Sequence, residues 1–235
     1  MKILAVDTAT KSCSVALVDN GVLSAELTVA TGETHSKHLM RTIEMVLERS
    51  GHVLSDLEGF AVIRGPGSFT GIRIGISTVK GLAMALGKPV VGISSLDALA
   101  AQSASPGFLI CPFLDARKRE VYFSRYRLVD GELQSEVAEQ VASPVRALEG
   151  IGEACLFVGD GAILYRDVII DNLGGLAHFV SGSPNIIRAC TVGILGQDRL
   201  EKGLAADVDT FVPHYIRRSD AELKKKASIT FSGNH

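Results

Sequence analysis

Two aspartates that follow short apolar runs are the residues best placed for phosphate or metal chemistry. Asp7 ends the run at residues 2–6, and Asp115 ends the run at 108–114. A strand that ends at an Asp and turns tightly can bring turn amides to phosphate oxygens, while the carboxylate holds metal-bound water. A Gly-x-Gly run later in each half, at 65–67 and 159–161, lets a backbone approach a ligand closely. The candidate nucleotide contacts are Asp7, Asp115, Gly159 and Gly161, although an Asp at a strand end is usually a cap or turn residue.

Other reactive side chains form weaker constellations. His35 and His38 lie three apart and share a helix face, but the spacing indicates no further zinc ligand, and an exposed helix start is the alternative. Ser68 and Thr70 have no general base placed by sequence, and helix capping explains both. Four scattered cysteines without a C-x-x-C pair favour buried thiols in a reducing cytosol over zinc or disulfides: Cys13, Cys111, Cys155 and Cys190. No metal site is predicted.

The elements that must hold these residues occur as the same series twice. In the first half we predict strands at 2–6, 14–18, 22–29, 60–63 and 90–93, and helices at 35–50, 70–86 and 95–102. In the second half we predict strands at 108–114, 121–128, 133–141 and 155–158, with a short helix at 143–148. Asn20-Gly21 and Asp130-Gly131 predict a hairpin in each half. Each half thus has the order strand–Asp–turn–hairpin–helix–strand–Gly-x-Gly–helix, which indicates an internal duplication.

The duplication sets the expected domain boundaries. We predict an N-terminal domain over 1–104 and a smaller C-terminal domain over 105–235. A late helix at 186–200 precedes an extended stretch at 207–215 and a helix at 220–226. We expect the last helix to pack back on the first domain, and the tail to fray from about 227.

Composition excludes several function classes. Hydrophobic residues make up 46% of the 235 residues and charged residues 21%, which is typical of a chain with a large core. Lys+Arg 24 against Asp+Glu 26 gives a net charge of -2, so no overall basic field attracts nucleic acid. Aromatic residues are 6%, with no Trp, which disfavours a stacking surface for single strands. The N-terminus does not resemble a signal peptide, and no apolar stretch approaches a membrane helix in length, so we expect a cytoplasmic chain without membrane contact.

The helix at 70–86 predicts a protein-binding surface. Arg73 and Lys80 are its only charged residues, and a helix that is apolar or small nearly all round must be buried on more than one side. Glycine inside a helix costs about 1 kcal/mol relative to Ala, and here it would allow a second helix to approach. Either this helix is buried within its own domain, or it packs with the helix at 35–50 against the same pair on a partner. The candidate interface residues are His38, Arg41, Met45, Gly71, Arg73, Ile74, Gly75, Thr78 and Leu82.

The duplicated series resembles the actin/hexokinase/Hsp70 (ASKHA) superfamily, which implies an α/β fold of two duplicated domains, the second smaller. Four runs are more specific: ILAVDTAT, RGPGSFTGIRIGISTVKGLA, GKPVVGISSLDALA and FLDARKREVYF. They are similar to the bacterial TsaB (YeaZ) family over residues 1–126, and the similarity resumes at VPHYIRR, residues 212–218.

The resemblance implies a non-catalytic relative of TsaD that pairs with it and works with the ATPase TsaE. Together they install threonylcarbamoyl on the adenosine 3′ of the anticodon in tRNAs that read codons beginning with A. It also implies that the face formed by the helices at 35–50 and 70–86 makes a homodimer or, alternatively, pairs with TsaD. This chain would require no cofactor of its own, ATP or ADP would enter only at the level of the complex, and tRNA would be reached indirectly.

One stretch decides whether this chain keeps the chemistry of TsaD. In TsaD a His-x-x-x-His pair holds the metal after the strand that follows the Gly-Pro-Gly helix, and the matching stretch here, 91–98, contains no histidine. Its Ser94, Ser95 and Asp97 can cap a helix but suit a transition metal poorly. We therefore predict a non-catalytic subunit. The alternatives are a metallopeptidase of the glycoprotease class, an acyl transferase in its own right, or a kinase or ATPase, although Lys11, Ser12, Lys118 and Arg119 do not reproduce the Gly-rich phosphate turn of active kinases.

Overall fold

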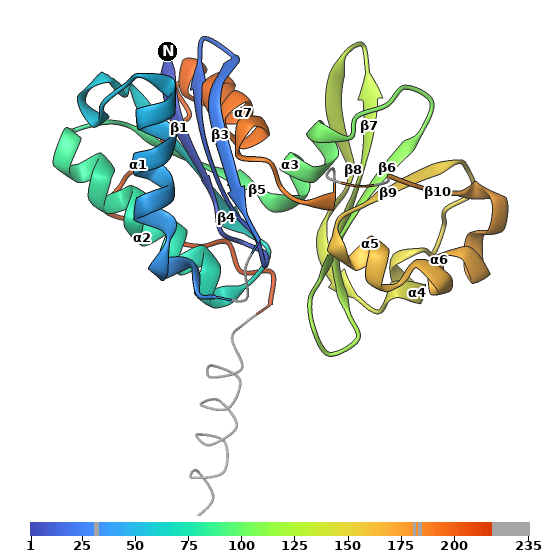
Figure 1. Ribbon diagram of the computed structural model, residues 1–235. Helices are drawn as coiled ribbons and strands as arrows, with labels where there is room; N and C mark the ends of the chain where they lie inside the picture. The colour runs from blue at the N-terminus through green and yellow to red at the C-terminus, as the bar shows by residue number, and fades with distance from the viewer. Residues whose placement is uncertain (31–32, 181, 183–184, 218–235) are drawn as a thin grey trace, which may run out of the picture.

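The computed structural model describes residues 1–30, 33–180, 182 and 185–217, so the predicted helix at 220–226 and the frayed tail lie outside the described residues. Two five-stranded sheets stand side by side, with helices on their faces and between them (Figure 1). The first sheet contains β1 (Lys2–Asp7), β2 (Cys13–Asp19), β3 (Val22–Val29), β4 (Gly59–Gly65) and β5 (Val90–Ser94). The second contains β6 (Leu109–Asp115), β7 (Val121–Val129), β8 (Glu132–Ala142), β9 (Cys155–Val158) and β10 (Ala177–Phe179).

The two sheets have the same topology. Their strand orders are β3-β2-β1-β4-β5 and β8-β7-β6-β9-β10. The first three strands of each are antiparallel, and the last two run parallel to the first strand. The predicted α/β duplication is confirmed. Strand β10 is the one strand of the second series that we did not predict, because three residues are too few to show a period of two.

Both predicted hairpins have the backbone that their turn residues favour. Asn20 and Gly21 have φ of 49° and 75°, and Asp130 and Gly131 have φ of 51° and 83°. Two successive left-handed residues define the type I′ turn, whose twist matches that of the flanking strands. The turns therefore fix the register of β2 with β3 and of β7 with β8.

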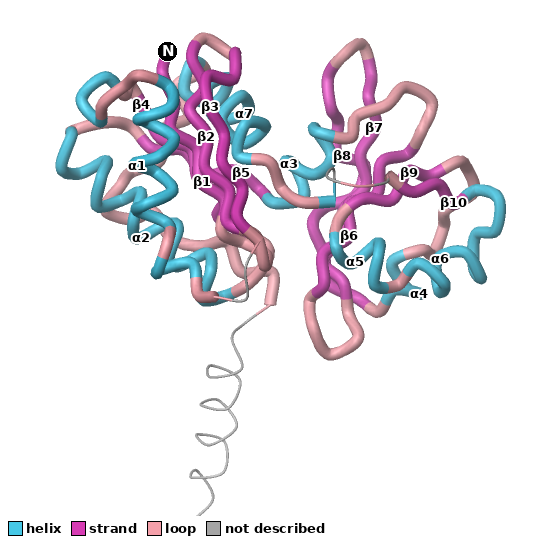
Figure 2. The backbone as a smooth tube through the Cα atoms, viewed as in Figure 1, coloured by secondary structure: helices cyan, strands magenta, loops and turns pink. Residues whose placement is uncertain are grey.

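Helices cover the outer face of each sheet and fill the space between the sheets (Figure 2). Helices α1 (Leu39–Ser50) and α2 (Phe69–Leu86) lie on one face of the first sheet, and α7 (Ala189–Glu201) lies on the other. Helix α3 (Ser95–Gln102) packs between the halves, against β6, α7 and strands of both sheets. The outer face of the second sheet is covered by α4 (Pro144–Ala147), α5 (Asp160–Leu164) and α6 (Arg166–Leu173).

The helix predicted at 35–50 is broken near its start. Residues His35–Lys37 form a 3-10 turn, and α1 begins after His38. The ends of α2 agree with the prediction: Ser68 caps its start by accepting a hydrogen bond from the Gly71 amide at 3.3 Å, and Gly87 ends it in the left-handed conformation.

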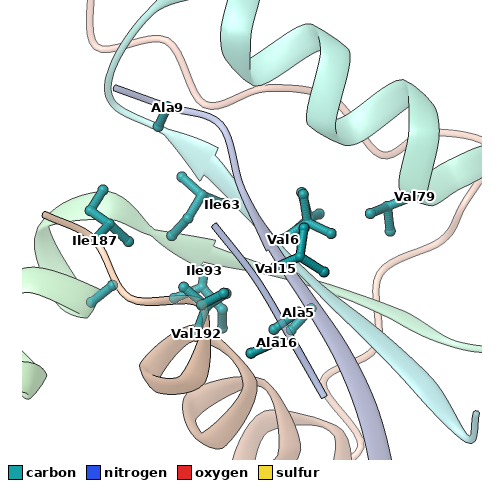
Figure 3. Close-up of a cluster of buried hydrophobic side chains, with 14 of the residues drawn as sticks. Ala5, Val6, Ala9, Val15, Ala16, Ile63, Val79, Ile93, Ile187 and Val192 are labelled. Atoms are coloured by element: carbon teal, nitrogen blue, oxygen red, sulfur yellow. The ribbon is translucent and has the colours of Figure 1, made fainter. Parts of the chain in front are cut away.

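Alternating side chains divide the core between the layers. Val6 and Val15 pair across β1 and β2 and face Val79 of α2, whereas Val192 of α7 approaches the opposite face of the sheet (Figure 3). Both sides belong to one buried cluster that continues past α3 to the inner face of the second sheet. A second cluster, formed with α5 and α6, fills the outer face of the second sheet. The continuity of the first cluster joins the two halves through apolar contact.

Helix α7 follows the second sheet in the sequence but packs on the first. Gly193 and Gly196 make the approach possible, because a Cβ would lie 2.6 Å from Val18 Cγ2 and 2.4 Å from Ala61 Cβ. At its start, the buried carboxylate of Glu26 on β3 accepts hydrogen bonds from the Arg188 guanidinium and from the Cys190 amide.

Helix α2 is the one helix of the described residues that is long and apolar enough to cross a membrane, although Arg73 and Lys80 interrupt its apolar sequence. Its 18 residues have a mean hydropathy of 1.2, so by length and composition it could cross a membrane. Its inner side chains, however, are buried against the first sheet in the same chain: Gly71, Ile72, Gly75, Ile76, Val79 and Ala83. The high hydropathy of α2 reflects this packing together with an outer face that carries few charges.

Candidate functional site

The outer face of α1 and α2 forms a shallow groove with a volume of about 520 Å³. Apolar residues and hydroxyls line it, with a single guanidinium: Ser36, Leu39, Met40, Phe69, Thr70, Arg73, Ile74, Ser77 and Thr78. Met40 remains 44% exposed and Phe69 37% exposed. Exposed apolar side chains gathered in one groove are typical of a protein-binding surface. We call this surface the α1–α2 groove.

The predicted interface residues are divided between the two sides of the helices. Arg73, Ile74 and Thr78 line the α1–α2 groove. Arg41 is exposed on α1, while His38, Met45 and Leu82 are partly exposed. All seven residues keep some exposed surface, and their role in an interface stays a prediction.

Gly71 and Gly75 require a correction, because both face the interior. A Cβ on Gly71 would lie 2.0 Å from the Thr8 carbonyl oxygen, and one on Gly75 would lie 2.4 Å from Thr8 Oγ1. Thr8 Oγ1 also donates to the Gly71 carbonyl at 2.8 Å. The expectation that these glycines meet a partner helix is therefore wrong. They let α2 approach the end of β1 within its own subunit.

A second candidate site is the cleft between the halves, with a volume of about 920 Å³. Cationic side chains predominate over carboxylates in its lining: Lys11, Arg117, Lys118 and Arg217 against Asp115 and Asp160. Phe69, Tyr122, Ile163, Leu164 and Tyr215 add apolar surface. The combination suits an anionic ligand with an apolar part.

Asp115 lines this cleft as predicted for a ligand-binding carboxylate, and its surroundings are polar. Its Oδ1 accepts from the Arg117 amide at 2.8 Å, and its own amide donates to Asp160 Oδ1 at 3.0 Å. Burial raises the pKa of the Asp160 carboxyl.

Asp7 occupies the matching corner of the first half but does not reach the cleft. Its Oδ1 accepts from the Ala9 amide at 2.9 Å, which repeats the local geometry of Asp115. The side chain is fully buried, and Oδ2 has no hydrogen-bond partner among the residues that the structure describes. Burial raises the pKa of this carboxyl to about 7. Asp7 is thus a buried acid and makes no surface for a nucleotide.

Gly159 and Gly161 are also directed into the protein. A Cβ on Gly159 would lie 2.3 Å from the Phe113 carbonyl oxygen, and one on Gly161 would lie 2.9 Å from the Leu114 carbonyl carbon. The two glycines let the start of α5 pack on β6, as Gly71 does for α2 and β1. The expectation that these glycines face a ligand is therefore wrong, because the side on which a Cβ would lie is against β6.

A basic turn at the cleft has an unusual backbone. Arg117, Lys118 and Arg119 have φ of 60°, 52° and 61°, a left-handed run that costs roughly 1–2 kcal/mol per residue. Arg217 holds the turn, since its Nη1 donates to the Ala116 carbonyl at 3.0 Å and its Nη2 pairs with the Glu120 carboxylate.

The stretch at 91–98, which contains no histidine, takes part in a network between the halves. The Asp97 carboxylate accepts from Tyr126 Oη at 2.9 Å and from Arg199 Nη2 at 3.0 Å. Ser94 caps α3 and donates to the Glu139 carboxylate, which also lies 3.2 Å from His214 Nε2. These polar side chains connect α3 to β7, β8 and α7.

The remaining reactive groups do not converge. His35 Nε2 lies 2.9 Å from the Thr10 carbonyl oxygen, whereas His38 Nδ1 lies 3.6 Å from the Glu33 carboxylate. Within residues 1–30, 33–180, 182 and 185–217, no three His, Cys, Asp or Glu side chains form a group that could hold a metal ion. All four cysteines are free thiols, and three of them are buried.

The sequence prediction missed three residues that shape both sites. Phe69 lines the α1–α2 groove and the cleft, and it stacks on Tyr215 with ring centroids 5.0 Å apart. Tyr215 and Arg217 belong to the run at 212–218 that carried part of the family resemblance, to which we had assigned no role. Their partners lie about 100 residues or more away in the chain, so no local spacing indicated them.

Comparison with known proteins gives consistent results. The model of a family described as TsaD, tRNA N6-adenosine threonylcarbamoyltransferase, matches residues 28–225. The tRNA threonylcarbamoyladenosine biosynthesis protein TsaB of Bacillus subtilis is 33% identical over 227 residues, which cover 95% of this chain and 97% of that protein. YeaZ from Pseudomonas aeruginosa superposes with a TM-score of 0.77 at 29% identity, over 91% of this chain and 99% of that one. Component A of (R)-2-hydroxyglutaryl-CoA dehydratase from Acidaminococcus fermentans shares the fold, with a TM-score of 0.53 at 13% identity over 86% of this chain and 99% of that one.

Proposed function

Because this chain belongs to the TsaB (YeaZ) family of tRNA threonylcarbamoyladenosine biosynthesis proteins, we propose that it is a non-catalytic scaffold subunit in that modification. The complex installs N6-threonylcarbamoyl on the adenosine 3′ of the anticodon, in tRNAs that read codons beginning with A. The chain pairs with TsaD and works with the ATPase TsaE. In this proposal it acts in the cytoplasm, contacts tRNA only through the complex, and forms a homodimer when TsaD is absent.

The α1–α2 groove is the observation that carries the proposal. It leaves Met40 and Phe69 substantially exposed on a helix pair whose inner side is fully packed. The TsaD family model matches most of this chain, so a TsaD partner has a related fold with an equivalent helix pair. Two such pairs can pack against each other and bury these side chains. Because the homodimer and the heterodimer with TsaD would use the same surface, the two dimers exclude each other.

The stretch at 91–98 supports a non-catalytic role. It carries no histidine, and its Ser94 and Asp97 side chains are engaged in the network that joins the halves. In this proposal the Ser94 and Asp97 side chains stabilise the relative position of the two halves and take no part in catalysis. In this proposal the chain requires no cofactor, and ATP or ADP binds only where the complex forms.

The cleft favours one second candidate, a nucleotide-dependent kinase or ATPase. Asp115 and the cations Lys11, Arg117 and Arg217 are the features that favour it. Calorimetric titration of the isolated chain with ATP and Mg²⁺ distinguishes the two. Tight binding with turnover in the absence of partners would support the second candidate and contradict the scaffold.

The proposal is tested by co-purification with TsaD and TsaE, followed by tRNA modification assays that omit each component. We expect modification only when this chain, TsaD and TsaE are all present. Modification by this chain alone would refute the non-catalytic role, and undiminished modification without it would refute the requirement for a scaffold.

A matched pair of variants tests the surface. Met40→Glu places a carboxylate in the α1–α2 groove, whereas Val53→Glu places one at a 59% exposed position of the same half, outside the groove. We expect Met40→Glu to weaken pairing with TsaD at least tenfold and Val53→Glu to leave it unchanged, with both variants folded by circular dichroism. Equal affinities would show that the partner binds elsewhere.

A further inference from the structure

The extended segment 207–217, which we call the strap, passes along α2 and on to the second half (Figure 1). At the C-terminal part of α2, Lys80 Nζ donates to the carbonyls of Asp209 at 3.3 Å and Phe211 at 3.2 Å. Near the start of the helix, the His214 amide donates to the Arg64 carbonyl at 2.7 Å. The strap is therefore attached to α2 at Lys80 and to the end of β4, shortly before α2 begins.

Directly after His214 the strap supplies one side of an aromatic stack. Tyr215 stacks on Phe69 with ring planes 24° apart. The Arg73 guanidinium lies over the Phe69 ring, with Cζ 3.8 Å from the ring centroid. Arg73 Nε also donates to Tyr215 Oη at 2.9 Å. Two contacts thus hold Arg73: the Phe69 ring of its own helix and the Tyr215 hydroxyl. The second depends directly on the position of Tyr215, and Tyr215 also packs on the Phe69 ring that makes the first.

This geometry leaves a specific part of Arg73 available. Its Nε is engaged by Tyr215, while Nη1 and Nη2 have no hydrogen-bond or ion-pair partner among the described residues up to 217. Two parallel Nη donors of a guanidinium match the two oxygens of a carboxylate. Arg73 is exposed and lines the groove beside Ile74. The groove therefore fits a helix that carries an Asp or Glu next to an apolar side chain.

We propose that Tyr215 is a positioning residue of the partner interface, and that Arg73, held by Tyr215 against Phe69, receives a carboxylate from a helix of the partner. The inference rests on the proposed function, because it takes TsaD as the occupant of the α1–α2 groove. Arginine and aromatic side chains at the centre of an interface commonly supply most of the binding energy. Fixing them before the partner arrives reduces the side-chain entropy lost on binding.

The strap also joins this stack to the second half. Arg217, two residues after Tyr215, pairs with Glu120 and with the Ala116 carbonyl, and His214 Nε2 lies 3.2 Å from the Glu139 carboxylate. Tyr215 therefore sits between anchors on both halves. Its place beside α2 depends on the second half as well as the first.

The test compares four folded variants for affinity to purified TsaD by calorimetry at two salt concentrations. Tyr215→Ala removes the stack and the hydroxyl, so we expect at least tenfold weaker binding. Tyr215→Phe keeps the stack but removes the hydroxyl that accepts from Arg73 Nε, so we expect a smaller loss of affinity than for Tyr215→Ala. Arg73→Gln should weaken binding at least tenfold and flatten the salt dependence, since the charge pair is lost. Val212→Ala, at a 65% exposed strap position, should match the wild type.

Each outcome bears on one of the two proposals. If the wild-type chain binds TsaD and Tyr215→Ala binds equally well, the positioning role is overturned. If Arg73→Gln binds with unchanged affinity and salt dependence, the carboxylate partner is overturned. If the wild-type chain does not bind TsaD at all, the proposed function fails, and the inference fails with it. Melting temperatures of all four variants identify a loss of affinity that is only a loss of fold.

Discussion

The buried carboxyl of Asp7 gives the sharpest quantitative prediction. Burial raises its pKa from 3.8 to about 7, because the charged form is desolvated. Below about pH 4 the group is protonated in the folded and the unfolded chain, and it does not affect stability. As the pH rises from about 4 to about 7, the unfolded chain ionises while the folded chain stays protonated, so the free energy of unfolding falls. At 1.36 kcal/mol per pKa unit the loss is about 4 kcal/mol.

The variant Asp7→Asn isolates this contribution. An amide keeps the oxygen that accepts from the Ala9 amide and cannot ionise. Its buried NH₂ group costs roughly 1–3 kcal/mol, but equally at every pH. The stability of the variant relative to wild type should therefore rise by about 4 kcal/mol between pH 4 and pH 8.

Urea unfolding at one-unit pH intervals measures this difference directly. Two stability curves that stay parallel from pH 4 to pH 8 would refute the reasoning, since the folded chain would then hold Asp7 ionised. That result would restore Asp7 as a candidate for cation binding. A difference that grows only above pH 4 and levels off near pH 7 to 8 is the expected result.

Two further predictions concern packing and the junction of the halves. Gly71→Ala should lower the free energy of unfolding by roughly 3 kcal/mol, because its Cβ would lie 2.0 Å from the Thr8 carbonyl oxygen. Gly81→Ala, with no heavy atom within 4 Å, should raise it by up to about 1 kcal/mol, and equal effects in urea unfolding would contradict the inward placement of Gly71. Arg199→Met should lower the free energy of unfolding by about 1–2 kcal/mol. A double-mutant cycle with Asp97→Asn should give a coupling energy above about 0.5 kcal/mol. Additive effects of the two substitutions would show that the ion pair does not contribute to stability.

The sequence predicted the fold well where the determining interactions are local. Asn20-Gly21 and Asp130-Gly131 require a left-handed backbone and adopt it, so both hairpins were correctly placed. Ser68 was one of two proposed caps for α2 and is the one used. The duplicated order of elements followed from these turns and from the apolar runs, and both sheets confirm it.

The site was harder to predict, because it depends on which side of an element faces which neighbour. Gly71 and Gly75 indicated a close approach to α2, which exists, but the approaching group is Thr8 of the same chain. Gly159 and Gly161 likewise indicated a close approach, which we predicted to be that of a nucleotide, but the neighbouring group is the backbone of β6. Glycine does not itself show which side a neighbour lies on, whereas the spacing of 71, 75, 79 and 83, all on one helical face, indicates the inward side.

The strap could not be predicted from spacing at all. Tyr215 and Arg73 are 142 residues apart, and neither lies in a periodic pattern that points to the other. The sequence predicted an extended stretch at 207–215 and a family resemblance at 212–218, but neither indicated what the segment would contact.

The position of α7 has a consequence for biosynthesis. A nascent chain that has left the ribosome as far as α3 contains the whole first sheet, but the helix that packs along one face of that sheet, α7, lies at residues 189–201. Ala5 and Ala16 on that face cannot pack against α7 until the entire second half has been translated. The second half is thus fully synthesised before the first half can complete its core. If translation stalls before residue 189, the apolar face of the first sheet that packs on α7 stays exposed and needs a chaperone to prevent aggregation.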